Sequence, residues 1–133
     1  MILLDTHALL WWVSDSKRVP AKATRLISTA VRAGEPIAVS SISIWEVAML
    51  VSRGRLTLNV ATDVWVGRVE ALPFLTFASV DNRIALRSAH LDSFPNRDPA
   101  DRLIAATAIE LGATLVTADA RLLSYKPVRT VWS

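Results

Sequence analysis

The sequence contains no cysteine, and only four of its 133 residues are glycine. Without cysteine the chain has no disulfide, no thiol nucleophile and no sulfur ligand for zinc. The glycines stand at positions 34, 54, 67 and 112, too far apart for a P-loop or a dinucleotide-binding loop. The lack of cysteine also fits a reducing compartment.

Long apolar runs are missing as well. The longest, Ala8 to Val13, has six residues, whereas a helix that spans a bilayer needs about 20. The N-terminus carries no basic region, and Asp5 and His7 interrupt its apolar residues. We therefore expect no signal peptide, no membrane contact and a cytoplasmic location.

The composition is that of a globular protein. Hydrophobic residues make up 52% of the chain and charged residues 20%, which suits one domain over residues 1–133. The apolar excess indicates that a partner covers part of the surface, most simply a second copy of the chain. The net charge is +3, and twelve of the fifteen basic residues are arginine. This mild basicity tolerates a polyanionic partner without requiring one.

Short apolar runs alternate with segments of helical periodicity along the chain. We expect strands over residues 2–4, 37–39, 74–77, 114–117 and 128–132. We expect helices over residues 21–33, 42–53, 61–72, 81–91 and 99–111. Asp98 and Pro99 mark the start of the last helix, and Gly112 marks its end. This order predicts an α/β fold with a mainly parallel sheet of four to five strands.

Acidic residues lie where the expected strands end. Asp5 directly follows the first strand, Glu46 lies early in the helix after the second, and Asp119 closely follows the fourth. Asp98 and Asp101 begin the helix that leads into that fourth strand. Because the carboxyl ends of parallel strands meet at one edge of the sheet, we expect these carboxylates to converge.

Converging carboxylates repel one another and raise each other's pKa values, and a divalent cation reverses that balance. Oxygen ligands with few histidines and no cysteine favour Mg²⁺ or Mn²⁺ over zinc. Such an ion activates water and stabilises phosphate oxygens. The pattern therefore points to phosphodiester hydrolysis that needs no covalent protein nucleophile.

Each of these acids also has a simpler explanation in helix capping. Asp5 suits an N-cap, and Ser43 to Glu46 fits the sequence of a capping box. The other acids stand at helix starts too, with Asp101 near the positive end of a helix dipole. Thr117 is an alternative cap after the fourth strand. Taken singly, each acid is better explained by capping; taken together, the acids favour a site. Asp81 is assigned a capping role only.

Four segments of the chain resemble the PIN-domain ribonucleases, specifically the VapC-type toxins of bacterial toxin–antitoxin modules. The segments are Leu4-Asp5-Thr6-His7 with Leu9-Leu10-Trp11, Ser40 to Glu46, Arg97 to Ala106, and Leu115 to Asp119. Each motif alone is weak, but their order over nearly the whole chain makes the resemblance specific.

The resemblance implies a PIN-like α/β/α sandwich and an endoribonuclease that depends on Mg²⁺ or Mn²⁺. It also implies homodimerisation and inhibition by a cognate antitoxin. The metal would be held by Asp5, Glu46, Asp101 and Asp119, with Asp98 as a supporting acid. Two neighbouring hydroxyls can orient a ligand or a water by hydrogen bonding, those of Thr6 and Thr117.

Basic and aromatic residues flank the acids. Three arginines can bind substrate phosphates or pair with the carboxylates, namely Arg97, Arg102 and Arg121, of which Arg102 suits a structural ion pair equally well. Three tryptophans can stack on unpaired bases or pack in the core, namely Trp11, Trp12 and Trp45. His7 is more simply a hydrogen-bonded residue than a catalytic one.

Two other protein families fit the sequence less well. A haloacid-dehalogenase-like phosphatase needs a second aspartate two residues after its nucleophile, but His7 stands at that position after Asp5. A receiver domain needs paired acids, a later aspartate and a lysine at strand ends, which are not found together here. The non-enzymatic alternative is a module that binds RNA or an antitoxin without cutting.

Overall fold

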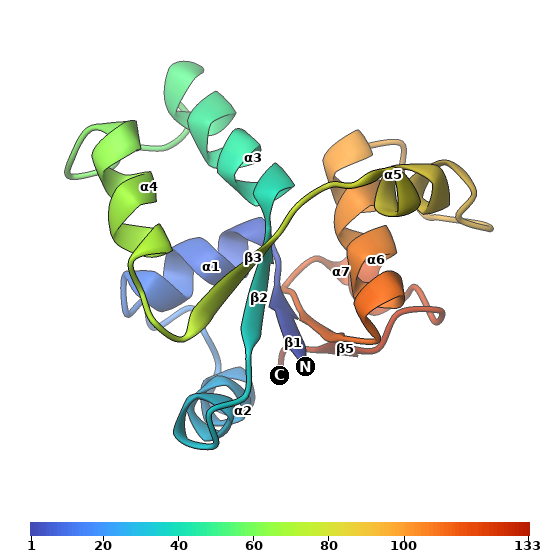
Figure 1. The fold of residues 1–133 in the computed structure, drawn as a ribbon, viewed down its shortest axis with the longest axis horizontal. Helices are drawn as coiled ribbons and strands as arrows, with labels where there is room; N and C mark the ends of the chain where they lie inside the picture. Colours follow the sequence, from blue (N-terminus) through green and yellow to red (C-terminus); the bar gives the residue numbers. More distant parts are fainter.

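The structure is a computed structural model that describes all 133 residues. Its strands are β1 (Ile2–Leu4), β2 (Ile37–Ser40), β3 (Leu75–Ala78), β4 (Thr114–Val116) and β5 (Thr130–Val131). Its helices are α1 (Thr6–Val13), α2 (Ala21–Arg32), α3 (Ser41–Ser52), α4 (Thr62–Glu70), α5 (Asn82–Ala89), α6 (Pro99–Leu111) and α7 (Ala120–Leu123). Figure 1 shows their arrangement around one sheet.

The five strands form one sheet in the order β3-β2-β1-β4-β5, and every pair is parallel. From β1 the chain adds β2 and β3 on one side and then crosses over to add β4 and β5 on the other. In open sheets of this kind, ligands bind beyond the carboxyl ends of the two neighbouring strands from which the chain adds further strands in opposite directions. Here those strands are β1 and β4, and the predicted mainly parallel sheet is confirmed.

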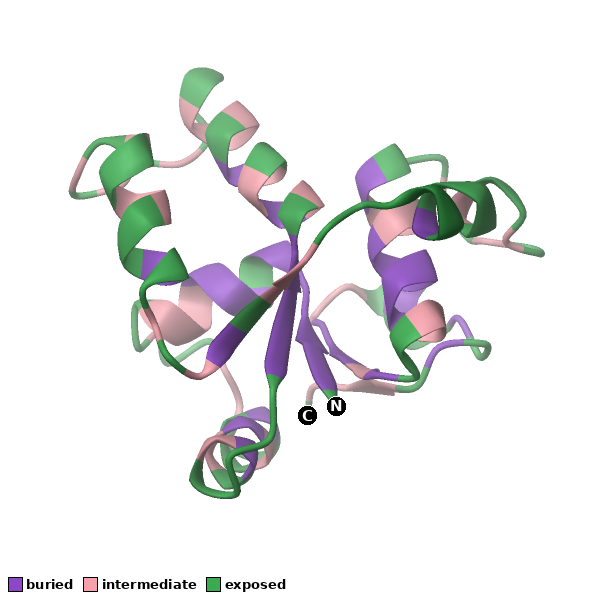
Figure 2. Ribbon diagram, in the orientation of Figure 1, coloured by how far each residue is buried: buried purple, intermediate pink, exposed green.

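The core has two parts, one on each face of the sheet. Ile2 and Leu4 of β1 belong to a cluster with Ile27 of α2, whereas Leu3 belongs to a second cluster with Ile104 of α6. The alternation follows from the pleat, which turns successive side chains to opposite faces. Helices α1, α2 and α4 cover the first face, and α6 covers the second (Figures 1 and 2). The result is the predicted α/β/α sandwich.

Helix α6 matches its predicted bounds because its end signals are unambiguous. The Asp98 carboxylate accepts a hydrogen bond from the backbone N–H of Ala100 at 2.9 Å, and Pro99 occupies the first turn. Gly112 follows the helix with φ of 61°, a left-handed conformation that glycine adopts without strain.

Two helices were not assigned from the sequence. In α1 nearly every residue after Thr6 is apolar, so no polar face reveals the helical period, although Asp5 had been considered as a cap. Helix α7 has only four residues. No helix of the structure has both the length and the apolar character needed to cross a membrane.

The central strand is where the loss of a side chain should cost most. Leu3 is fully buried and Leu86 on α5 is 64% exposed. We expect Leu3→Ala to lower the free energy of unfolding by about 3 kcal/mol, because a cavity remains in a packed core. We expect Leu86→Ala to change it by less than about 0.5 kcal/mol. Urea unfolding measures both values, and equal losses would contradict the assignment of the core.

Candidate active site

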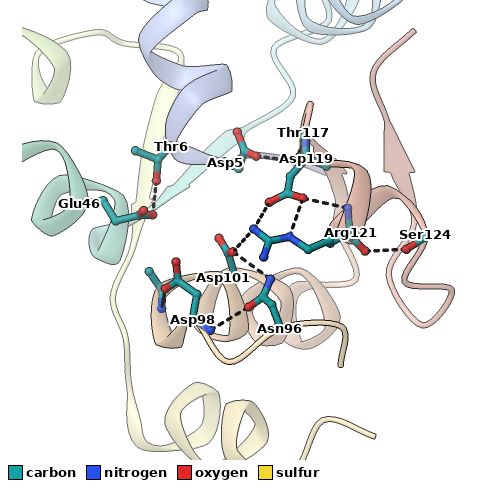
Figure 3. Close-up of polar contacts among 11 residues, drawn as sticks. Asp5, Thr6, Glu46, Asn96, Asp98, Asp101, Thr117, Asp119, Arg121 and Ser124 are labelled. Carbon is teal, nitrogen blue, oxygen red and sulfur yellow. Dashed lines mark hydrogen bonds and ion pairs between the residues drawn. The ribbon is translucent and has the colours of Figure 1, made fainter. Parts of the chain in front are cut away.

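A pocket of about 510 Å³ opens beyond the carboxyl ends of β1 and β4. Five carboxylates line it, contributed by Asp5, Glu46, Asp98, Asp101 and Asp119. Figure 3 shows these side chains, which come from four separate parts of the chain. The structure thus brings together all the acids that the sequence singled out for the site.

Asp5 is the most buried of the acids, with 7% of its surface exposed. Its Oδ1 accepts a hydrogen bond from the backbone N–H of Ala8 at 2.8 Å and so caps α1. Its Oδ2 accepts a hydrogen bond from the hydroxyl of Thr117, which follows the neighbouring strand β4. Burial raises the pKa of Asp5, and these two hydrogen bonds oppose the rise because they favour the charged form.

Glu46 lies on α3 and is held by α1. The Thr6 hydroxyl oxygen lies 2.6 Å from Glu46 Oε1 and 2.9 Å from the hydroxyl oxygen of buried Ser43. Because a carboxylate only accepts hydrogen bonds, Thr6 gives its one proton to Glu46, and Ser43 donates to Thr6. Partial burial raises the pKa of Glu46, and the hydrogen bond from Thr6 opposes this.

The capping box suggested for Ser43 to Glu46 is wrong. Helix α3 begins at Ser41, and the side chain of Ser40 caps it by accepting from the backbone N–H of Ile42 at 3.2 Å. Glu46 therefore lies one turn inside the helix. Its position toward the pocket has no capping explanation.

Asp101 lies in the first turn of α6, and its side chain is 15% exposed. Its Oδ2 accepts a hydrogen bond from the Asn96 side-chain amide at 3.1 Å. Burial, followed by the charges of Asp98, Asp119 and Glu46, raises the pKa of Asp101 to about 6. This side chain therefore experiences most directly the repulsion expected among converging carboxylates.

Asp119 and Arg121 form the side of the pocket next to β4. The Asp119 carboxylate caps the short helix α7 by accepting from the backbone N–H of Arg121 at 2.9 Å. The Arg121 guanidinium Nη2 lies 3.4 Å from Asp119 Oδ2 and 3.9 Å from Asp101 Oδ2. It thus spans two of the acids and offsets part of their charge (Figure 3).

Capping and pocket-lining coincide at three of the acids. Asp5, Asp98 and Asp119 each cap a helix, as the simpler explanation held, and each also faces the pocket. The cap after β4 is Asp119, since Thr117 donates to Asp5 and accepts from the Asp119 backbone N–H at 3.1 Å. Asp81 caps α5 away from the pocket. Asp101 lies in the first turn of α6, where the helix dipole favours an acid, as its simpler explanation held. Glu46 alone has no such local explanation, which favours a function for the cluster.

The donor set fits a hard divalent cation such as Mg²⁺ or Mn²⁺. All its candidate ligands are carboxylate oxygens, and neither Glu46 Oε2 nor Asp101 Oδ1 is engaged in a hydrogen bond or ion pair. No three Asp, Glu or His side chains lie close enough together to form a preformed metal site. Binding would therefore require side-chain rotations that bring these carboxylates closer together.

The three flanking arginines differ in position. Arg121 lines the pocket. Arg102 instead donates to the backbone carbonyl of Ser88 at 2.9 Å and lies over the ring of Phe94. It forms no ion pair, so the expected ion pair is absent although its contacts are structural. Arg97 is exposed and does not line the pocket.

The three tryptophans differ too. Trp12 packs edge-on against Phe74 at the border of the core, as the packing alternative held. Trp11 and His7 both line the acidic pocket, with ring centroids 5.6 Å apart. Trp45 is 53% exposed.

Sequence reasoning missed two residues that position the acids. Ser43 supports Thr6, and Asn96 holds Asp101. Ser43 was considered only as part of a capping box, and Asn96 was assigned no role. No local sequence pattern predicts either hydrogen bond. The one local signal is that Asn96 stands two residues before Asp98, and its side-chain oxygen accepts a hydrogen bond from the Asp98 backbone N–H.

Comparison with known proteins identifies relatives. The family model of the PIN domain matches residues 2–126. Ribonuclease VapC22 of Mycobacterium tuberculosis is 38% identical over 133 residues, which cover 98% of this chain and 98% of that protein.

Solved structures share the architecture. VapBC2 from Rickettsia felis, crystallised with a DNA fragment from its promoter, matches with a TM-score of 0.72 and 20% identity over 100% of both chains. A toxin–antitoxin complex from Klebsiella pneumoniae matches with a TM-score of 0.62 and 22% identity, covering 96% of this chain and 95% of that one. At such identities the likeness shows the fold alone.

Repulsion between Asp101 and the neighbouring carboxylates should lower the free energy of unfolding of the metal-free protein. The pKa of Asp101 in the folded state, about 6, lies above its unfolded value of 3.8. The stabilising contribution of Asp101 to the free energy of unfolding is therefore fully present below about pH 4 and is lost as the pH rises through 6. After a discount for solvent screening, we expect Asp101→Asn to stabilise the protein by on the order of 1 kcal/mol at about pH 8 in EDTA.

The control for this prediction is Asp63→Asn, which alters an exposed acid at the start of α4. Thermal or urea unfolding across the pH range measures both variants. We expect the gain of Asp101→Asn to vanish below about pH 4 and Asp63→Asn to show no such gain. A loss of stability by Asp101→Asn at high pH would contradict the account.

Proposed function

The chain belongs to the PIN-domain family, and we propose that it is a metal-dependent endoribonuclease, the toxin of a type II toxin–antitoxin pair. The observation that carries this proposal is the meeting of five carboxylates from four separate segments in one pocket. The name and 38% identity of the mycobacterial ribonuclease support RNA as the substrate class.

In this proposal Asp5, Glu46, Asp101 and Asp119 hold Mg²⁺ or Mn²⁺. When bound, the ion supplies Lewis acidity and lowers the pKa of a water molecule. Hard oxygen ligands favour these ions, and Mg²⁺ retains waters that can reach a phosphate. Asp98 adds negative charge at the pocket edge without being assigned as a ligand.

The hydroxyl residues position the ligands. Thr6 holds Glu46 from α1, and Thr117 holds Asp5 from the end of β4. Hydrogen bonds to the metal-ligating carboxylates fix the orientation of these side chains before a cation binds. In the hydrolysis a water oxygen would bond to the phosphorus while the P–O bond to one ribose oxygen breaks and that oxygen leaves with a proton, so no side chain of the pocket has to act as a nucleophile.

Arg121 has two states in this proposal. In the structure its guanidinium lies between Asp101 and Asp119. Once these carboxylates are neutralised, the guanidinium leaves Asp101 and binds a phosphate oxygen of the substrate, for which its planar fork is suited.

The remaining parts of the proposal concern assembly. Toxin–antitoxin complexes among the structural matches support an antitoxin partner. Exposed apolar side chains such as Trp45 and Leu86 are compatible with a surface that a partner or a second copy covers. The sheet extends through β5, so we include residues 1–133 in one PIN domain. The cytoplasmic location stays a prediction.

RNA cleavage tests the proposal directly. Total cellular RNA is incubated with the protein in Mg²⁺ or in EDTA, and new 5′ ends are mapped by sequencing. We expect cuts at a few positions, abolition by EDTA, and a loss of on the order of 100-fold or more in Asp101→Asn. The Asp101→Asn variant should still fold, because removal of the Asp101 charge relieves repulsion among the carboxylates.

The matched control is Asp81→Asn. Asp81 caps α5 at 2.9 Å from the backbone N–H of Ile84, and asparagine is an equally good cap. This variant should cut like the wild type. Cleavage by Asp101→Asn at the wild-type rate would refute the site, and a wild type that binds RNA without cutting would favour the binding-module alternative.

A further inference from the structure

A second cavity of about 500 Å³ lies next to the acidic pocket. It is lined by residues of α1 and of the loop that follows it, of the end of α3, of the loop between α3 and α4, and of α4. His7 and Trp11 line both cavities, so the two are neighbours across these side chains. We call the second cavity the arginine groove, after Arg18, Arg55 and Arg68 in its lining.

The charge of the arginine groove is opposite to that of the acidic pocket. Three guanidinium groups line it, and no Asp or Glu does. Only three arginines of the chain form ion pairs: Arg83 and Arg87 pair with Glu110, and Arg121 pairs with Asp119 and Asp101. None of the three groove arginines forms an ion pair, so their charges are free for an anionic ligand.

The groove also offers flat apolar surface between these charges. Trp11 and Trp65 are half-buried and line it. The Arg18 guanidinium carbon lies 5.4 Å from the ring centroid of Trp11. Guanidinium groups beside aromatic rings are the elements with which proteins hold single-stranded nucleic acid, through phosphates and stacked bases respectively.

The acidic pocket creates the need for such a surface. Five carboxylates repel a phosphate backbone, and even a bound cation offsets only part of that charge. The affinity for RNA must therefore come largely from outside the pocket. The arginine groove adjoins the pocket and carries the required charge.

We propose that single-stranded RNA on one side of the scissile phosphate lies in the arginine groove, with Arg18, Arg55 and Arg68 at its phosphates and Trp11 beneath a base. This inference rests on the proposed function and adds the path of the substrate to it. Paired bases are not available for stacking, which makes an unpaired stretch the ligand. An acidic segment of a partner protein is the competing occupant, and the test separates the two.

The test measures RNA binding without cleavage. The background is Asp101→Asn, and the probe is a fluorescent mixed-sequence RNA of about 12 nucleotides, a typical length for such grooves. Fluorescence anisotropy gives the affinity of the parent and of R18A, R55A and R68A. The matched control is R25A, since Arg25 is exposed on α2, forms no ion pair and lies outside the groove.

We expect each groove variant to weaken RNA binding by about 3- to 10-fold and R25A by less than about 2-fold, because only phosphate contacts release counterions. The slope of log affinity against log salt should fall by about 0.7 for each groove arginine removed. Arginine-to-lysine variants should keep most of that slope. The duplex form of the same RNA should bind more weakly, and thermal unfolding checks that each variant is folded.

Several outcomes overturn the inference. Groove variants that bind RNA as tightly as R25A would do so, because the groove would then be left to the competing occupant, an acidic segment of a partner protein. If the cleaving wild type and its groove variants cut RNA equally well, the arginine groove is not on the substrate path and the proposed function stands. If the wild type with metal neither binds nor cuts RNA, the proposed function itself fails.

Discussion

Repulsion among carboxylates is the constraint around which this molecule is organised. Five acids face one pocket, and burial and mutual charge raise the pKa of Asp101 to about 6. The protein meets part of this cost itself, through hydrogen bonds from Thr117 to Asp5 and from Thr6 to Glu46, and through the Arg121 guanidinium. A stable domain retains such crowding only where another factor maintains it, and cation binding is the function that we propose for it.

The fold places this charge beyond β1 and β4, where the order of strand addition to the sheet reverses. β1 and β4 are neighbours, and the residues that follow them, Asp5 and Thr117, meet directly beyond their paired ends. Helix capping places the other carboxylates, because Asp5 and Asp119 follow strands and also cap the next helices, and Asp98 caps α6. Local structure and the site are thus built from the same side chains at Asp5, Asp98 and Asp119, and the basic groove next to them supplies the opposite charge.

Much of this was accessible from sequence. Helix α6 was predicted to the residue because Asp98, Pro99 and Gly112 mark its ends, and the acids were found because parallel strands share an edge. Helix α1 was not assigned, because a uniformly apolar helix hides its period. The Asn96 contact with Asp101, the different environments of Arg102 and Arg121, and the arginine groove arise from distant segments meeting in space, so no local pattern predicts them.

Direct titration with Mn²⁺, with the free ion followed by electron paramagnetic resonance, tests whether the carboxylate pocket is a metal site. We expect the wild type to remove Mn²⁺ from the free pool and Asp119→Asn to remove much less. Arg121→Gln should bind Mn²⁺ at least as tightly as the wild type does, because this variant lacks the guanidinium that competes with the ion for Asp101 and Asp119. No binding by the wild type, or equal binding by Asp119→Asn, would contradict the account.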